Sequence, residues 1–299
     1  MSKKLYIAII FCLLMVSGAY AQSKNWEKAL KAYQEENFDD AIKFSDNSIM
    51  DDAESKDAYT WHVRGFIYRA AHKKLDDSSP ASKLRETSIE SFLKSIELDS
   101  NKEFEIKNKS AVINLAKTYF NDAVRALSAE TFEDAIEYYA KYKDVTRRVE
   151  PDFSFKQTDI DFNNTLGAVY QNIYENDKGA NQNFMQKAID VYKTTIEIDS
   201  LNYNANYNIG VLYYNQGVDL ILSIDPEAPL PIVIETQEMC AELFIRSLPY
   251  MKRAYNLKPT NRETIIGLAG IYFNLNDNEK SKFFSDLLKE VEDNDSPNR

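Results

Sequence analysis

The stretch FDDAIKF at residues 38–44 is repeated along this chain. It returns closely as FEDAIEYY at residues 132–139 and more loosely as FMQKAIDVY at residues 184–192. In each copy an alanine stands three or four positions from an aromatic residue on either side, a spacing that places the side chains on one face of an α-helix. An active site is seldom repeated three times in one chain, so the repetition favours a packing unit.

A second pattern marks a helix upstream of these stretches. Four segments place a small residue three positions before a tyrosine, which puts both on one helical face and lets a neighbouring helix approach closely. The pairs are Gly65 and Tyr68, Gly167 and Tyr170, Gly210 and Tyr213, and Ala269 and Tyr272. Glycine and proline are scarce, at eight each, and strand patterns with tight turns are missing. The sequence therefore predicts an all-α protein of stacked helix pairs, because one pair cannot bury both of its faces alone.

These residues resemble the tetratricopeptide repeat family. The family motif is matched in the second copy by Trp61, Gly65, Tyr68, Phe92 and Ser100, in the fourth by Leu166, Gly167, Tyr170, Ala188, Tyr192 and Ser200, and in the fifth by Ile209, Gly210, Tyr213, Met251, Ala254 and Pro259. The resemblance implies an α-solenoid of about six helix-turn-helix pairs forming a right-handed superhelix.

The expected solenoid covers residues 22–292, followed by a polar flexible tail at 293–299. The six copies are predicted at about residues 23–52, 57–101, 108–149, 157–201, 203–259 and 260–292. Most copies are longer than the family period of ~34 residues. In the fifth copy the additional residues lie at about 218–241 and include Pro226, Pro229 and Pro231. These prolines predict a stiff bend between two lengthened helices. Pro249 is expected to kink its helix or to start a new helical segment.

The first 21 residues have the features of a secretory signal. Lys3 and Lys4 precede an uncharged run at residues 5–16, and Ala19-Tyr20-Ala21 matches a cleavage signature. No later window approaches 18 apolar residues, so no transmembrane segment is expected in the mature chain. The predicted location is the periplasm of a Gram-negative bacterium, with secretion as the alternative.

The net charge argues against one class of binding partner, and the cysteine content argues against a disulfide within the chain. Removal of the signal leaves 36 − 2 = 34 basic against 47 acidic residues, a net charge of −13, which argues against a nucleic acid partner. Cys12 leaves with the signal, so Cys240 has no partner within the chain and is expected to be a small buried side chain.

The sequence predicts neither an enzyme nor a cofactor or metal site. His62 and His72 lack further ligands at metal-binding spacing, and phosphate-loop, hydrolase and zinc-protease motifs do not occur. Paired acids such as Asp39 with Asp40 and Glu133 with Asp134 are interpreted as the negatively charged first turn of a helix. A hydrolase built as an α/α toroid remains a less favoured alternative.

The resemblance also implies a concave groove lined by the first helix of each pair, which would bind a protein or peptide. The candidate groove residues are Tyr59, His62, Arg69, Asn164, Gln171, Asn172, Asn204, Tyr207, Asn208, Tyr214, Asn215 and Asn274. Their amides can hold a peptide backbone and their tyrosines supply contact area. Asn208 matches the asparagine of the family's carboxylate clamp, but the accompanying lysines are absent, which favours an internal or extended segment. The other function considered is a structural or assembly component of a cell-envelope complex; the oligomeric state stays open.

Overall fold

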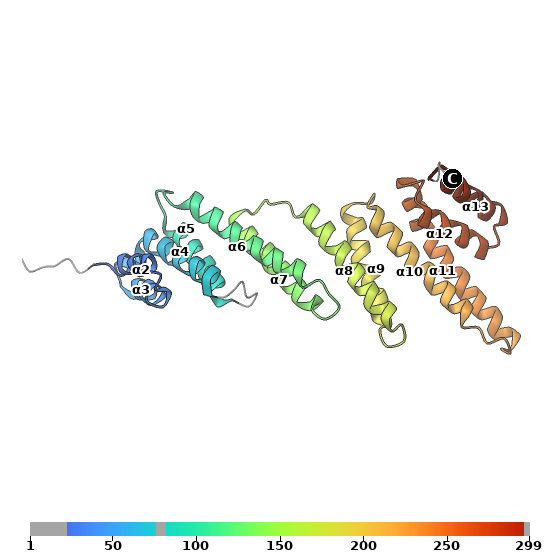
Figure 1. The fold of residues 1–299 in the computed structure, drawn as a ribbon, viewed down its shortest axis with the longest axis horizontal. Coiled ribbons are helices and arrows are strands. Elements are labelled where there is room, and N and C mark those ends of the chain that lie inside the picture. The colour runs from blue at the N-terminus through green and yellow to red at the C-terminus, as the bar shows by residue number, and fades with distance from the viewer. Residues whose placement is uncertain (1–22, 76–81, 296–299) are drawn as a thin grey trace, which may run out of the picture. The chain divides into compact units, whose positions relative to one another are not determined.

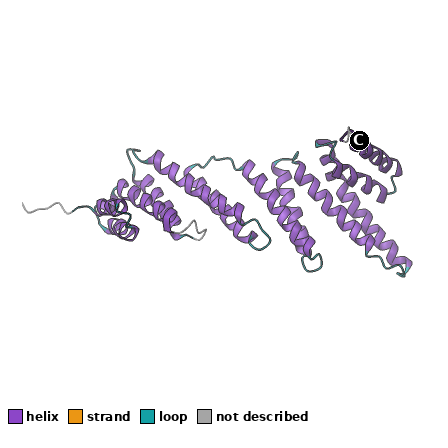
Figure 2. Cartoon of the chain, in the orientation of Figure 1, coloured by secondary structure: helices purple, strands orange, loops and turns teal. Residues whose placement is uncertain are grey.

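Residues 23–75 and 82–295 are described by the computed structural model (Figure 1). Within these ranges the regular structure consists of twelve α-helices and one 3-10 helix, and no strand is present (Figure 2). The predicted all-α class is therefore confirmed. The predicted signal at residues 1–21 lies outside the described residues.

The helices follow one another as six antiparallel pairs joined by short connections. Their bounds are α2 Asn25–Gln34 and α3 Phe38–Met50; α4 Ala58–Leu75 and α5 Lys83–Leu98; α6 Glu105–Arg125 and α7 Phe132–Val149; α8 Lys156–Asn176 and α9 Gln182–Ile198; α10 Tyr203–Leu222 and α11 Leu230–Leu257; α12 Arg262–Asn274 and α13 Asn278–Asp295. The 3-10 helix η1, Glu54–Lys56, connects the first two pairs. Paired helical hairpins of this kind are the arrangement that the repeated sequence pattern predicts.

The chain divides into two compact units. The first contains the residues up to Ala123 together with Ile136–Phe153, and the second contains Val124–Ala135 and the residues from Ser154 onward. The first unit therefore holds the α2–α3 and α4–α5 pairs with most of α6 and α7. The second holds the three pairs from α8 to α13.

Two of the small residues predicted to allow close helix approach contact a large side chain of the next helix. A Cβ atom added to Gly65 on α4 would lie 2.7 Å from the Phe92 ring of α5. A Cβ atom at Gly167 on α8 would lie 2.6 Å from the Tyr192 ring of α9. Both distances are far below van der Waals contact, so only glycine permits these two hairpins to close so tightly.

FDDAIKF forms the first two turns of α3. Asn37 caps this helix, because its side-chain oxygen accepts a hydrogen bond from the Asp40 backbone N–H at 3.2 Å. Asp39 and Asp40 occupy the first turn, where negative charge is favourable, while Ala41 is completely buried. The interpretation of this acid pair as a helix opening is confirmed.

The α10–α11 hairpin differs in one respect from its prediction. The bend at the prolines is present, since Pro226 and Pro229 lie between the helices and Pro231 lies in the first turn of α11. Helix α11 then runs without interruption through Pro249, so the new helical segment expected at Pro249 does not form. Cys240 on the same helix is buried, as predicted.

A buried ion pair crosses the first unit. Arg85 of α5 and Asp122 of α6 are 1% and 2% exposed, and Arg85 Nη1 lies 2.6 Å from Asp122 Oδ2. The guanidinium also donates to Thr118 Oγ1 at 2.9 Å and covers the Tyr119 ring at 3.6 Å from its centroid. The two charges are 37 positions apart in sequence, and they tie α5 to α6.

Candidate functional site

A groove in the first unit collects two of the predicted site residues. Helices α4 and α6 form its sides and Phe92 of α5 forms part of its floor, enclosing a cavity of about 480 Å³. The lining residues are His62, Phe66, Arg69, Phe92, Ile106, Lys107, Ser110 and Ala111. His62 and Arg69 were predicted to face a groove, whereas the residues from α6 were not. This cavity is called the α4–α6 groove below.

His62 is fixed at one end of the groove. Its Nδ1 lies 2.6 Å from Asn108 Oδ1, and the Asn108 amide nitrogen donates to Ser95 Oγ at 2.8 Å. Because this leaves the amide oxygen to accept, His62 Nδ1 carries the hydrogen. The imidazole also stacks on Phe104 with 5.2 Å between ring centroids and on Tyr59 with 6.0 Å. His62 and Tyr59 therefore join α4 to α6. Because Nδ1 and the stacked ring faces of His62 already contact protein, a ligand could reach only the remaining ring atoms.

Two cations face this groove without a carboxylate. Arg69 lies 5.9 Å from the centroids of both Phe66 and Phe92, and Lys107 lies on the exposed side of α6. Within the described part of the chain neither Arg69 nor Lys107 forms an ion pair. A chain with an excess of acidic residues thus leaves a guanidinium and an ammonium group unneutralised beside an apolar floor.

In the second unit three of the predicted asparagines bond to the protein itself. Asn208 Nδ2 donates to the Tyr192 hydroxyl at 2.9 Å, and Asn274 Nδ2 donates to the Gly270 carbonyl at 2.8 Å. Asn164 Nδ2 donates to Asn202 Oδ1 at 3.3 Å, which also caps α10. These amides hold neighbouring helices and helix ends in place, so much of their hydrogen-bonding capacity is already used.

Tyr207 and Tyr214 pack within the second unit. Both contact the apolar cluster built around Phe244, Met251 and Leu268, and burial raises the pKa of each hydroxyl. Tyr207 also stacks face to face on Tyr203, with 5.7 Å between centroids. Their flat surfaces are largely covered by protein, which limits the contact area that they can offer to a peptide.

The remaining predicted residues keep their amides open. Gln171, Asn172, Asn204 and Asn215 lie on α8 and α10, with Asn172 and Asn204 exposed and the other two half-buried. In the part of the chain that the structure describes, these four side chains form no hydrogen bond to protein. They are the polar surface of the first helices in this unit.

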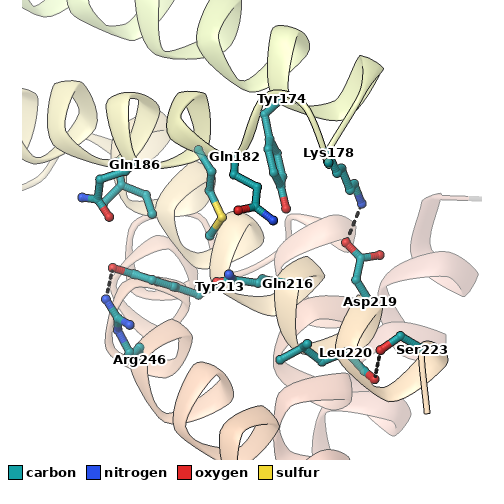
Figure 3. A pocket seen from close by; sticks show the side chains of 13 residues that line it. Tyr174, Lys178, Gln182, Gln186, Tyr213, Gln216, Asp219, Leu220, Ser223 and Arg246 are labelled. Carbon is teal, nitrogen blue, oxygen red and sulfur yellow. Dashed lines mark hydrogen bonds and ion pairs between the residues drawn. The ribbon is translucent and has the colours of Figure 1, made fainter. Parts of the chain in front are cut away.

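A larger cavity, which the sequence did not predict, lies in the second unit (Figure 3). It measures about 560 Å³ and is lined by Tyr174, Lys178, Gly179, Gln182, Met185, Gln186, Ile189, Tyr213, Gln216, Asp219, Leu220, Ser223 and Arg246. Helices α8 to α11 and the α8–α9 turn all contribute. The prediction missed it because it considered only the first helix of each pair.

Two of the three charged side chains that line this cavity, Lys178 and Asp219, form an ion pair. Lys178 Nζ lies 2.5 Å from Asp219 Oδ2 (Figure 3). It also lies 3.2 Å from Glu175 Oε2, and these carboxylates raise the pKa of the lysine. Arg246 donates to the Tyr213 hydroxyl at 2.9 Å and lies 4.4 Å from the centroid of that ring. Lys178 and Asp219 tie the α8–α9 turn to α10, a structural role.

No group of three or more His, Cys, Asp or Glu side chains among the described residues could hold a metal ion. None of the described helices combines the length and the apolar character needed to cross a bilayer.

Comparison with known proteins gives distant structural likenesses. No family model matches the chain, and no curated protein matches it. Among solved structures, the TPR2AB-domain:pHSP90-complex of yeast Sti1 is 12% identical, with a TM-score of 0.31 and 93% of each chain covered. The human IFIT1 dimer with m7Gppp-AAAA is also 12% identical, with a TM-score of 0.29, and the match covers 87% of this chain and 58% of that one.

Proposed function

We propose that the protein is a non-catalytic scaffold that binds a segment of another protein in the α4–α6 groove. One observation carries the proposal: Arg69 and Lys107 lie unneutralised beside the apolar floor formed by Phe66 and Phe92. Leaving two cations without acids in an acidic protein favours a ligand that brings its own negative charge.

The groove chemistry defines the bound segment. Phe66, Phe92 and Ala111 provide a surface for one apolar side chain, and the Arg69 guanidinium can hold a carboxylate through two parallel hydrogen bonds. Ser110 adds a hydroxyl that can donate to a peptide carbonyl. We therefore propose a segment in which an acidic residue stands close to a leucine or an aromatic residue.

Selection from a random peptide library tests this proposal. The wild-type protein should enrich segments with Asp or Glu near a large apolar residue. The variant R69Q together with K107Q should bind the selected peptides at least tenfold more weakly, since a hydrogen bond to a charged group contributes roughly 1.5–3 kcal/mol. Peptide affinity is measured by fluorescence anisotropy.

A matched control is available at the end of the same helix. Lys73 and Lys74 are exposed on α4 and do not line the groove. K73Q with K74Q removes the same net charge and should leave peptide affinity within twofold of wild type. Equal losses of peptide affinity in both double variants would mean that binding follows net charge alone, which would contradict binding in the α4–α6 groove.

We also propose that the protein is exported to the periplasm, on the basis of the predicted signal at residues 1–21. N-terminal sequencing of the protein from its native host should then begin at Gln22. A chain that keeps Met1 in the cytoplasm would contradict export.

A further inference from the structure

The α10–α11 hairpin exposes a stripe of three apolar side chains and one glutamine on its second helix. Leu230, Ile234, Gln237 and Ala241 are spaced four, three and four positions apart, so they share one face of α11. Leu230 is 70% exposed and Ile234 is 47% exposed. These four residues are called the α11 stripe.

The α11 stripe continues into a cavity of about 370 Å³. One wall of this cavity comes from α11, through Gln237, Cys240, Ala241 and Phe244. The other lining residues lie at or just after the end of α10 (Ile221, Ile224), at the end of α12 (Phe273, Asn274), and in the turn and first residue of α13 (Asn276, Asn278). Phe273 is 64% exposed, so a large aromatic ring stands at the edge of the cavity without full cover. The α11 stripe and this cavity together form a channel of apolar and amide side chains, called the α11 groove.

Acids without an ion pair lie along one side of the α11 stripe. Residues 194–245 contain eight Asp or Glu residues and no Lys, Arg or His. Glu238 and Glu242 lie on α11 beside the stripe, and Glu227 and Glu235 lie near the hairpin turn. Within the described residues none of these four carboxylates forms an ion pair. These acids form a negative rim on one side of the groove, and such a rim is complementary to a basic amphipathic surface.

From this channel and its rim we propose that the α11 groove binds a helical segment of a partner protein with an apolar face flanked by Lys or Arg. The stripe extends over residues 230–241, about 16 Å of helix, which matches three turns of a bound helix. The α11 backbone is fully helical and offers no free edge, so an added β-strand is excluded. The site differs from the α4–α6 groove in residues and in charge, and it does not depend on that proposal.

Other occupants fit the rim less well. Anionic lipid head groups and the acids of this surface would repel each other. A second copy of this chain pairing through the same surface would bring two negative rims together, which is also unfavourable. Both are separate outcomes of the experiment below.

The probe is a designed 18-residue peptide with leucines on one helical face and lysines on the other, labelled for fluorescence anisotropy. Wild-type protein should bind it saturably with one peptide per chain, and a matched peptide with glutamate in place of lysine should bind at least tenfold more weakly. The variant L230S, I234S, F273S should lower affinity for the lysine peptide at least tenfold. All three side chains are substantially exposed, so the fold should be retained, which circular dichroism checks.

The control variant M50S with L75S removes two exposed apolar side chains from the first unit, neither of which lines the α4–α6 groove. It should leave affinity for the lysine peptide unchanged, whereas E238Q with E242Q should lower it several-fold. Equal binding by wild type and the triple variant would overturn the proposal. So would saturable binding to phosphatidylglycerol vesicles, or self-association in analytical ultracentrifugation, that is lost in the triple variant.

Discussion

At the scale of single residues, Arg85 and Asp122 provide the sharpest test of the first unit. Their ion pair is almost completely removed from water, so loss of one partner leaves an uncompensated buried charge. We expect D122A to lower the free energy of unfolding by about 3–5 kcal/mol. Urea denaturation followed by circular dichroism measures this change.

The double variant R85M, D122L separates charge from packing. Replacing both charges by apolar groups of similar volume removes the desolvation penalty, so it should be much less damaging than D122A. If both variants were equally destabilised, the loss would come from packing around Tyr119 and not from the unpaired charge.

Tyr192 gives a prediction about alkaline pH. Burial is the main cause that raises its pKa to about 12, although the Asn208 hydrogen bond acts in the opposite direction. The ordinary pKa near 10 applies to the unfolded chain, which therefore loses the proton first as the pH rises. The contribution of Tyr192 is complete below pH 10 and is lost between about pH 10 and pH 12, by at most about 3 kcal/mol.

The variant Y192F removes this titration. Its unfolding free energy should fall less steeply than that of wild type between pH 10 and pH 12, as measured by urea titrations at several pH values. Parallel curves for the two proteins would show that Tyr192 ionises equally easily in both states. The comparison cancels the lysines, which titrate in the same range in both proteins.

The sequence predicted residue positions better than residue partners. Gly65 and Gly167 were identified as sites of close helix approach because glycine and tyrosine recur at a fixed spacing. The structure places an aromatic ring against each of them. The partner of Asn208 was not foreseen, since the Tyr192 hydroxyl is reached only once two helices pack. Arg85 and Asp122 were also missed, because a pair 37 positions apart leaves no periodic signal.

At the scale of helices, α11 continues through Pro249 instead of starting a new segment there. Proline in a helix interior removes one backbone hydrogen bond and crowds the carbonyl four residues earlier, here that of Ile245. Both Pro249 and Ile245 are exposed, so water can reach that region of the helix. Packing of Ser247 and Met251 in the core holds α11 continuous across the proline.

We expect P249A to stabilise the protein by about 1–3 kcal/mol, because it restores the missing hydrogen bond and removes the steric conflict. The midpoint of urea unfolding should rise. An unchanged or lower midpoint would mean that α11 already accommodates the proline without strain, or that the proline contributes by restricting the unfolded chain.

Helix boundaries could be predicted where the signal is local. Asn37, Asn202 and Asn261 stand at helix starts, and each accepts a hydrogen bond from a backbone N–H three residues later. The α4–α6 groove could be predicted only in part, because Lys107 comes from a helix that lacks the glycine and tyrosine pattern. Its position depends on how α6 packs against α4, which periodicity alone does not define.

At the scale of the whole molecule, the two compact units each bury their own core. Phe92 in the first unit is 2% exposed, and Phe244 in the second is 1% exposed. In proteins built from repeated helix pairs, each pair contacts its neighbours and cooperativity across a long array is limited. The two units are therefore expected to unfold in separable steps.

Two matched substitutions test this expectation. F92A and F244A each remove a buried phenyl ring, which should destabilise the affected unit by about 3–5 kcal/mol. Calorimetry should show that F92A lowers the temperature of one transition and F244A that of the other. If either variant shifted a single common transition, the chain would unfold as one cooperative body, and a ligand bound in the α4–α6 groove would then protect the second unit as strongly as the first.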